Sequence, residues 1–165
     1  MTDIPAIVDL GARDAQFWLD AANASVRDFC GWHVAPVITQ TLRIDGSGSR
    51  TLLLPSQRVV RVVRCLNDGV DITDQIHVSE RNGILERSSG LWSARLGGVQ
   101  LVLEHGHVSV PGVAGVIAAL AARGASMPAG VVQQSVGPAS VRYGTIPLLA
   151  EEKTTLEPYR LTWGS

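Results

Sequence analysis

The sequence predicts an α+β fold: a small bundle of three main helices with an antiparallel, β-rich insert between the first and second long helices. Apolar residues recur every three or four positions at 12–31 and again at 111–124, which predicts two helices. Between them, residues 37–107 form short β-branched runs separated by turn residues. A shorter helical pattern occupies the start of 145–165. The 165 residues suit one domain, 1–165, with a sizeable core.

The composition excludes several classes of protein. The formal net charge is −1 and only 18% of residues are charged, which argues against a strong phosphate-binding surface. No run approaches the ~20 apolar residues that span a bilayer, and the N-terminus lacks a signal-peptide pattern. We therefore expect synthesis in the cytoplasm and no membrane partner. The two cysteines, Cys30 and Cys65, are too few for a disulfide framework and are expected to be buried.

The helix at 12–31 is predicted to be amphipathic. Gly31 suits the left-handed conformation that ends a helix, and Asp9 or Asp14 suits its N-cap. One face of this helix is predicted to carry Ala15, Trp18, Ala22, Val26 and Phe29.

The insert is predicted to be antiparallel, because its runs are short and the turns between them contain Asn-Gly, Asp-Gly or Ser-Gly. Val99, Leu101 and Leu103 alternate clearly and share one face. On a regular strand Arg58, Arg61 and Arg64 would alternate faces, so no continuous basic stripe is expected. The expected strands are 37–44, 50–54, 58–66, 75–79, 84–87 and 99–105.

The helix at 111–124 begins with Pro111 in its first turn and is closed by Gly124. It is apolar almost all round, and such a helix is usually buried on more than one side. We expect it to pack on the first helix and on a neighbouring subunit. The subunit-interface candidates are Val113, Val116, Ile117 and Leu120.

The last part of the chain is predicted to be an arm at 126–144, which has room for a strand, followed by a helix and a tail. Thr145 is the expected cap of that helix, Pro147 lies near its start and Pro158 ends it. Glu151, Glu152 and Lys153 are expected on a solvated face.

Catalytic and metal-binding interpretations are weak. Cys30 and His33 are three residues apart, but Cys30 adjoins the apolar helix face, where a buried thiol is the better interpretation. His77, His105 and His107 lack a nearby Cys or carboxylate to complete a metal site. Trp18, Trp32 and Trp92 are expected in the core or at interfaces. We therefore expect no catalytic residue, no cofactor and no metal.

Four local patterns carry a family resemblance. They are VRDFCGWHVAPVITQTLRIDG at 26–46, NGILERSSGLW at 82–92 before a strand ending in EHGH at 104–107, VVQQSVGPASVRYG at 131–144 and LLAEEKTTLEPYRL at 148–161. Their order and spacing resemble the head-to-tail connector, or adaptor, proteins of long-tailed bacteriophages, especially the type found in phages and prophages of actinobacteria. The resemblance covers residues 13 to 161.

This resemblance implies a structural virion protein and not an enzyme. The family forms a ring of about twelve subunits beneath the portal protein, in the neck of the virion, and meets a tail-side connector or tail terminator protein. Double-stranded DNA passes through its channel without sequence-specific binding. The C-terminal segment of related connectors engages the portal. The portal-interface candidates in this chain are Leu156, Tyr159, Arg160, Leu161 and Trp163.

Features of the sequence itself agree with this expectation. The apolar second helix suits packing between ring subunits, and the charge balance suits a channel wall that does not hold DNA tightly. Tyr159, Arg160 and Leu161 combine group types found at interface hot spots. The alternatives are a small nucleic-acid-binding β module with flanking helices, and a hydrolase that uses Cys30.

Overall fold

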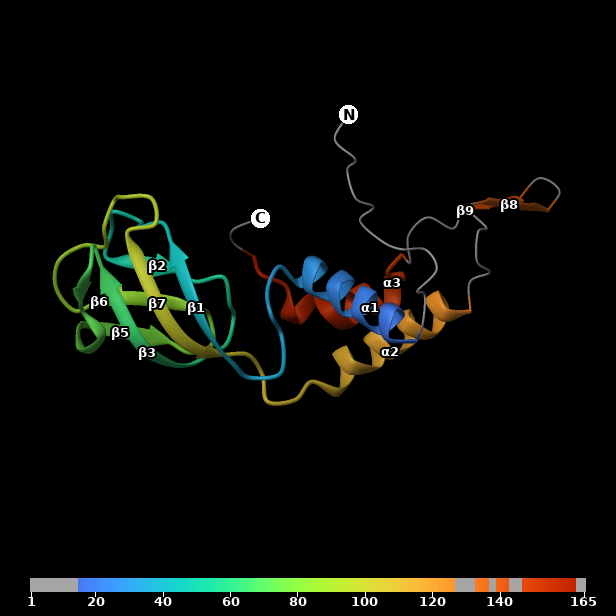
Figure 1. Ribbon diagram of the computed structural model, residues 1–165, viewed down its shortest axis with the longest axis horizontal. Helices are drawn as coiled ribbons and strands as arrows, with labels where there is room; N and C mark the ends of the chain where they lie inside the picture. The colour runs from blue at the N-terminus through green and yellow to red at the C-terminus, as the bar shows by residue number, and fades with distance from the viewer. Residues whose placement is uncertain (1–14, 127–132, 137–138, 143–146, 163–165) are drawn as a thin grey trace, which may run out of the picture. The chain divides into compact units, whose positions relative to one another are not determined.

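A computed structural model describes residues 15–126, 133–136, 139–142 and 147–162 (Figure 1). The chain divides into two compact units, which are described separately. One contains Met1–Val26 and Pro111–Leu156, and the other contains Arg27–Val110 and Glu157–Ser165. We call them the helical unit and the β unit.

The three predicted helices and the antiparallel insert between the first two are confirmed. The helices are α1 (Ala15–Cys30), α2 (Pro111–Ala125) and α3 (Ala150–Leu156). Two short 3-10 turns accompany them, η1 (Thr73–Gln75) and η2 (Glu157–Tyr159). The fold is therefore α+β, as the periodicity of the sequence predicts.

Helix α1 ends where its sequence requires. Gly31 has a φ of +77° and its N–H donates to the carbonyl of Arg27 at 2.7 Å, which closes the last turn. The predicted face is confirmed except at Ala15, and Cys30 extends it. Ala22, Val26 and Cys30 are buried, Trp18 and Phe29 are half-buried, and Ala15 is exposed.

The β unit is built from two antiparallel sheets. The first has the order β1-β7-β3-β4 and the second has the order β2-β6-β5. Every expected strand is present within one residue of its predicted ends, and β4 is an additional two-residue strand. The strands are β1 (Ile38–Ile44), β2 (Thr51–Leu53), β3 (Val59–Asn67), β4 (Val70–Asp71), β5 (Ile76–Ser79), β6 (Ile84–Arg87) and β7 (Val99–His105).

The core of the β unit comes from both sheets. Val99, Leu101 and Leu103 of β7 are fully buried, which confirms their predicted common face. Trp92 is 2% exposed, and its indole N–H donates to the Arg50 carbonyl at 3.1 Å. The cluster consists of Leu52, Leu54, Val59, Cys65, Ile72, Leu85, Trp92, Val99, Leu101 and Leu103.

Strand β3 contains two register shifts against β7, and they overturn the expected placement of its arginines. Arg61 is opposite Glu104 and Arg64 is opposite Val102, with one extra residue, Val60 or Val63, before each arginine. Each bulge adds a residue and so resets the alternation of faces. Arg61 and Arg64 consequently lie on the same outer face of the sheet, although a regular strand would separate them.

The turn between β5 and β6 depends on Gly83. Its φ is +59°, and an added Cβ would collide with the backbone carbonyl oxygen of Ser56. The Leu54 N–H also donates to the Gly83 carbonyl at 2.7 Å. The predicted Asn-Gly turn is therefore required both by the backbone conformation and by the closeness of a neighbouring segment.

In the helical unit, α2 continues to Ala125, so Gly124 is buried inside the helix and does not terminate it. Strands β8 (Gln133–Val136) and β9 (Ala139–Arg142) pair as an antiparallel hairpin within the predicted arm. Helix α3 begins only at Ala150, so Pro147 precedes it by three residues, while Thr145 lies outside the described residues. Pro158 falls in the η2 turn that follows the helix.

Candidate interaction surfaces

The C-terminal tail segment, residues 157–162, is attached to the β unit by backbone hydrogen bonds. The indole N–H of Trp32 donates to the Tyr159 carbonyl at 2.6 Å, and the Leu161 N–H donates to the Cys30 carbonyl at 2.8 Å. The Gln57 side-chain amide donates to the carbonyl of Arg160. The tail segment is therefore an integral part of the β unit.

Side chains of the tail segment add to this attachment. The Tyr159 ring meets His107 edge-on with centroids 5.6 Å apart, and the Arg160 guanidinium lies 5.5 Å from the centre of the Phe29 ring. Tyr159 and Leu161 are half-buried and Arg160 is exposed. Of the other portal-interface candidates, Leu156 is fully buried at the end of α3, and Trp163 lies outside the described residues.

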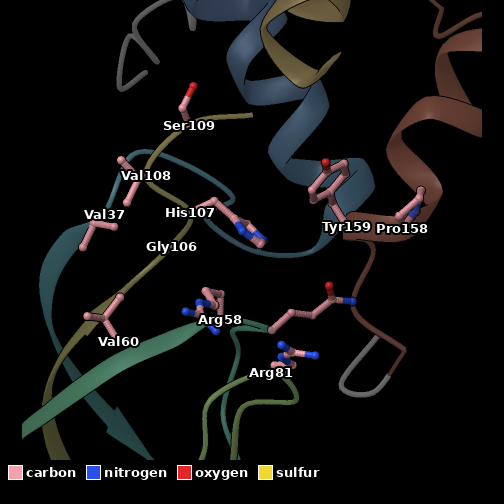
Figure 2. A pocket seen from close by; sticks show the side chains of 11 residues that line it. Val37, Arg58, Val60, Arg81, Gly106, His107, Val108, Ser109, Pro158 and Tyr159 are labelled. Atoms are coloured by element: carbon pink, nitrogen blue, oxygen red, sulfur yellow. The ribbon is translucent and has the colours of Figure 1, made fainter. Parts of the chain in front are cut away.

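A cleft of about 760 Å³ opens within the β unit beside Tyr159 (Figure 2). Figure 2 shows three valines on one side of the cleft and Tyr159 with Pro158 on the other. The lining residues are Val37, Gln57, Arg58, Val60, Arg81, Gly106, His107, Val108, Ser109, Pro158 and Tyr159. Strand β3 supplies Val60 through its first bulge, and the segment after β7 supplies Val108.

The cleft combines apolar and cationic groups. Val60 is 45% exposed and Val108 is 86% exposed, so both present apolar surface to solvent. Arg58 lies 3.7 Å from Glu80, whereas Arg81 makes no ion pair with any described residue. No carboxylate or thiol lines the cleft. These groups suit the binding of an apolar, negatively charged partner.

Helix α2 directs its largest side chains into its own unit. Val113, Val116 and Leu120 are buried within the subunit, and Ile117 is half-buried. The exposed positions of the helix are occupied by small residues, namely Gly112, Ala114, Gly115, Ala118, Ala119 and Ala122. The apolar character of the helix therefore reflects one buried row of large side chains and an exposed face with very short ones.

Arg123 and Glu152 form an ion pair that the sequence interpretation missed. The two guanidinium nitrogens of Arg123 donate to the two carboxylate oxygens of Glu152 at 2.6 and 2.8 Å. Glu152 is 9% exposed, so it does not lie on a solvated face as expected. It also accepts the Leu149 N–H at 2.9 Å, which caps the start of α3.

The hydrogen bonds from Arg123, together with the one from the Leu149 N–H, lower the pKa of the Glu152 carboxyl against the opposing effect of burial. The two partners are 29 positions apart in the chain. No local pattern in the sequence signals this pairing.

The arginines of β3 are matched by carboxylates. Arg61 lies 2.6 Å from Glu104, and Arg64 lies 3.3 Å from Asp71. Duplex binding depends on unpaired cations that neutralise phosphates. The outer face of the sheet, with Arg61 and Arg64 already paired, therefore provides little support for the nucleic-acid-binding alternative.

The described residues also lack the features of a reactive centre. Burial raises the pKa of the Cys30 thiol to about 11 and that of Cys65 to about 12, so neither forms a nucleophilic thiolate near neutral pH. His105 is buried, with its ring nitrogens 3.0 Å from Ser56 Oγ and 2.9 Å from Gln40 Oε1.

Neither a metal-binding cluster nor a membrane-spanning helix is found in the described part of the chain. No group of three or more His, Cys, Asp or Glu residues there is placed to hold a metal ion. Within the same residues, every helix is too short or too polar to cross a bilayer.

The α+β fold is shared with proteins of phage-like particles. A chain in the neck of the native gene transfer agent particle, computed with C12 symmetry, superposes with a TM-score of 0.64 at 14% identity, covering 92% of this chain and 84% of that one. A chain in the neck of the empty particle, computed with C6 symmetry, gives 0.58 at 17% identity and covers 92% and 79%.

A chain in the virion of the native gene transfer agent gives a TM-score of 0.59 at 18% identity, covering 97% of this chain and 84% of that one. No protein-family model matches the sequence, and no curated protein sequence matches it. At these identities the likeness establishes the fold, over nearly the whole chain. The role of the protein has to be argued from that fold together with the surfaces described above.

Proposed function

We propose that this protein is a structural, non-enzymatic component of the neck of a phage-like particle, a head-to-tail connector of the type found in phages and prophages of actinobacteria. Copies of the chain assemble into a ring of twelve beneath the portal protein and join the DNA-filled head to the tail. The observation that carries this proposal is the likeness of 92% of the chain to a chain in a neck with C12 symmetry.

The site chemistry supports a role that depends on contacts between proteins. The described residues offer buried thiols with raised pKa values, hydrogen-bonded histidines and paired arginines in place of a reactive cluster. The small exposed side chains of α2 allow close approach of another helix, as packing between ring subunits requires. DNA passes through the ring without sequence-specific contacts, and the tail side receives a tail-side connector or tail terminator protein.

The C-terminal tail segment remains the proposed portal contact. Among the portal-interface candidates of this segment Arg160 is exposed, and Tyr159 and Leu161 are half-buried. Leu156, which directly precedes the segment, is buried. In this arrangement the tail segment both completes the β unit and presents Arg160 to the portal.

The proposal is tested by the mass and shape of the assembled protein. Light scattering and electron microscopy of the purified chain, alone and mixed with the portal protein of its particle, should give twelvefold rings that bind the portal vertex. Arg160→Glu should reduce portal binding and leave the circular dichroism spectrum unchanged. A protein that stays monomeric and ignores the portal would refute the proposal, and a gel shift on duplex DNA that weakens with salt would favour the nucleic-acid-binding alternative.

A further inference from the structure

We propose that the cleft of the β unit binds the N-terminal segment of a second copy of this chain, residues 1–10. The cleft has a volume typical of sites that enclose a ligand or a short piece of chain. Its walls are provided by valines, Tyr159 and Pro158, and its cations by Arg58 and Arg81 (Figure 2). The partner that fits such a site has aliphatic side chains next to carboxylates.

The ion pairing of the two arginines indicates which of them would bind a carboxylate of the partner. Glu80, at 3.7 Å, already accompanies Arg58, but Arg81 has no carboxylate partner among the described residues. His107 lies between the two sides of the cleft in Figure 2. Burial lowers the pKa of its imidazole, and the positive charge of Arg58 lowers it further. His107 therefore adds no positive charge near neutral pH. An incoming carboxylate would therefore pair first with Arg81.

The sequence of this chain contains one segment of the matching kind. The parts of the chain outside the described residues are 1–14, 127–132, 137–138, 143–146 and 163–165, and carboxylates occur only in the first of them. Residues 1–10 read MTDIPAIVDL and contain Asp3 and Asp9 among four large aliphatic side chains, with no Lys or Arg. Ten extended residues span at most ~36 Å.

The resulting contact is directional. The segment of one copy meets the cleft of another, so the two surfaces in contact are different. Such contacts generate a ring or an open filament when they run head to tail, and a twofold dimer when two copies exchange their segments reciprocally. This inference does not rest on a place in the neck: rings that form without the contact would refute it and leave the proposed function intact.

Binding is tested with a fluorescent, N-acetylated peptide of residues 1–10 and the full-length protein. Anisotropy should show saturable binding that weakens about tenfold in Arg81→Glu and in Val60→Asp. Arg95→Glu is the matched control, because Arg95 is exposed outside the cleft, with a side chain that is 82% accessible, and should bind as the wild type does. A peptide with Asp3 and Asp9 changed to lysine should bind Arg81→Glu better than it binds the wild type.

Contact between copies is tested with a photo-crosslinker in place of Ile7 in the full-length chain. Irradiation should give a covalent dimer, with the crosslink mapped by mass spectrometry to the residues of the cleft. No saturable binding up to about 1 mM peptide, equal weakening by Arg95→Glu, crosslinks within one copy, or crosslinks outside the cleft would each overturn the proposal.

Discussion

At the scale of single residues, the ion pair between Arg123 and Glu152 connects two helices of the helical unit. It joins the last turn of α2 to the first turn of α3 through two parallel hydrogen bonds. Planar, bidentate pairing of this kind is a property of arginine that lysine does not reproduce. Because Glu152 is nearly buried, its charge depends on the guanidinium for compensation.

Replacing Arg123 should therefore destabilise the protein. We expect Arg123→Ala to lower the free energy of unfolding by about 1–3 kcal/mol, and Arg123→Lys to recover only part of that loss. Chemical denaturation measures both. Arg95→Ala is the control, because its exposed guanidinium is 4.0 Å from Asp68, and it should change stability by less than about 1 kcal/mol. Equal losses in the Ala variants of Arg95 and Arg123 would contradict this account.

The same pair predicts a dependence on acidity. The pKa of Glu152 is lowered in the folded state from its ordinary value of 4.5. Its contribution is therefore complete above pH 4.5 and is lost as the pH falls through the lower folded-state pKa. Wild type and Glu152→Gln should differ most in stability above pH 5 and converge in strong acid, as urea denaturation across this range would show. A constant difference down to pH 2 would contradict the assignment.

His105 is a basic group whose pKa is also lowered in the folded protein. Burial, and then the neighbouring His33, lower the pKa of His105 from 6.5, so the folded protein favours the neutral ring. Its contribution is complete above pH 6.5 and is lost as the pH falls below it, because the unfolded chain binds the proton first. The groups that face it are His33, Trp32, Gln40 and Ser56, and Arg58 adds positive charge near His107.

The measurement is stability between pH 7.5 and pH 5 by thermal or urea unfolding. We expect the stability of the wild type to fall across this range and that of His105→Gln to fall less steeply, although the variant is less stable at pH 7.5. His77→Gln is the control, because His77 is exposed, and it should follow the wild type. If all three proteins lost stability in parallel, the role assigned to His105 would be wrong.

At the scale of elements, local signals predicted most of the β unit. Its strands match because each turn contains Gly, Asn or Asp next to runs of β-branched residues, and both signals are local. The bulges in β3 escaped prediction because the Val-Val-Arg repeat has no period of two, and only pairing with β7 shows which valine is extra. The interaction of Glu152 with Arg123 was missed because its partner is on another helix.

The surfaces were predicted less completely than the elements. The apolar second helix was expected to pack on a neighbouring subunit; its exposed positions carry short side chains, and that expectation stays a prediction. The cleft was not predicted at all, because residues from β3, from the segment after β7 and from the tail segment form it together. Sequence reasoning named Tyr159 without its neighbours, since only the fold brings them together.

The turn at Gly83 offers a test with a close internal control. Gly83 and Gly69 both have positive φ values, +59° and +83°, but an added Cβ meets the Ser56 carbonyl at Gly83 and nothing within 4 Å at Gly69. We expect Gly69→Ala to cost about 1–2 kcal/mol from the backbone alone, and Gly83→Ala to cost distinctly more because a segment must also move. Equal losses in equilibrium unfolding would contradict the close approach.

Helix α2 can be tested on both of its faces. Leu120 is fully buried, so Leu120→Ala should cost about 2–5 kcal/mol in unfolding experiments on the isolated subunit. Ala118→Glu places a large charge on the exposed face and should leave unfolding nearly unchanged while it reduces association, measured by light scattering. Unchanged assembly by Ala118→Glu would exclude this face as a subunit contact.

At the scale of the whole molecule, the chain passes back and forth between the two units. The chain leaves the helical unit within α1, builds the sheets, returns through α2 and α3, and then contributes residues 157–165 to the β unit. Both units are therefore made of segments distant in sequence. Neither unit corresponds to a continuous piece of the chain, so expression of either alone requires both of its segments.

Removing the tail segment should accordingly destabilise the β unit itself. A truncation after Leu156 removes the acceptors of Trp32 and Gln57, the Leu161 N–H and one wall of the cleft. We expect a less stable β unit and a changed tryptophan emission spectrum, because the Trp32 indole N–H loses its acceptor. Unaltered stability and emission would show that the tail segment contributes nothing to the fold.

The hydrogen bond from Trp32 to Tyr159 links residues 127 positions apart. During synthesis the strands therefore precede the segment that completes the β unit, and the Trp32 indole gains its acceptor only after Tyr159 has been added. A product truncated before Tyr159 would lack this hydrogen bond, and the Trp32 indole N–H would be left without that acceptor.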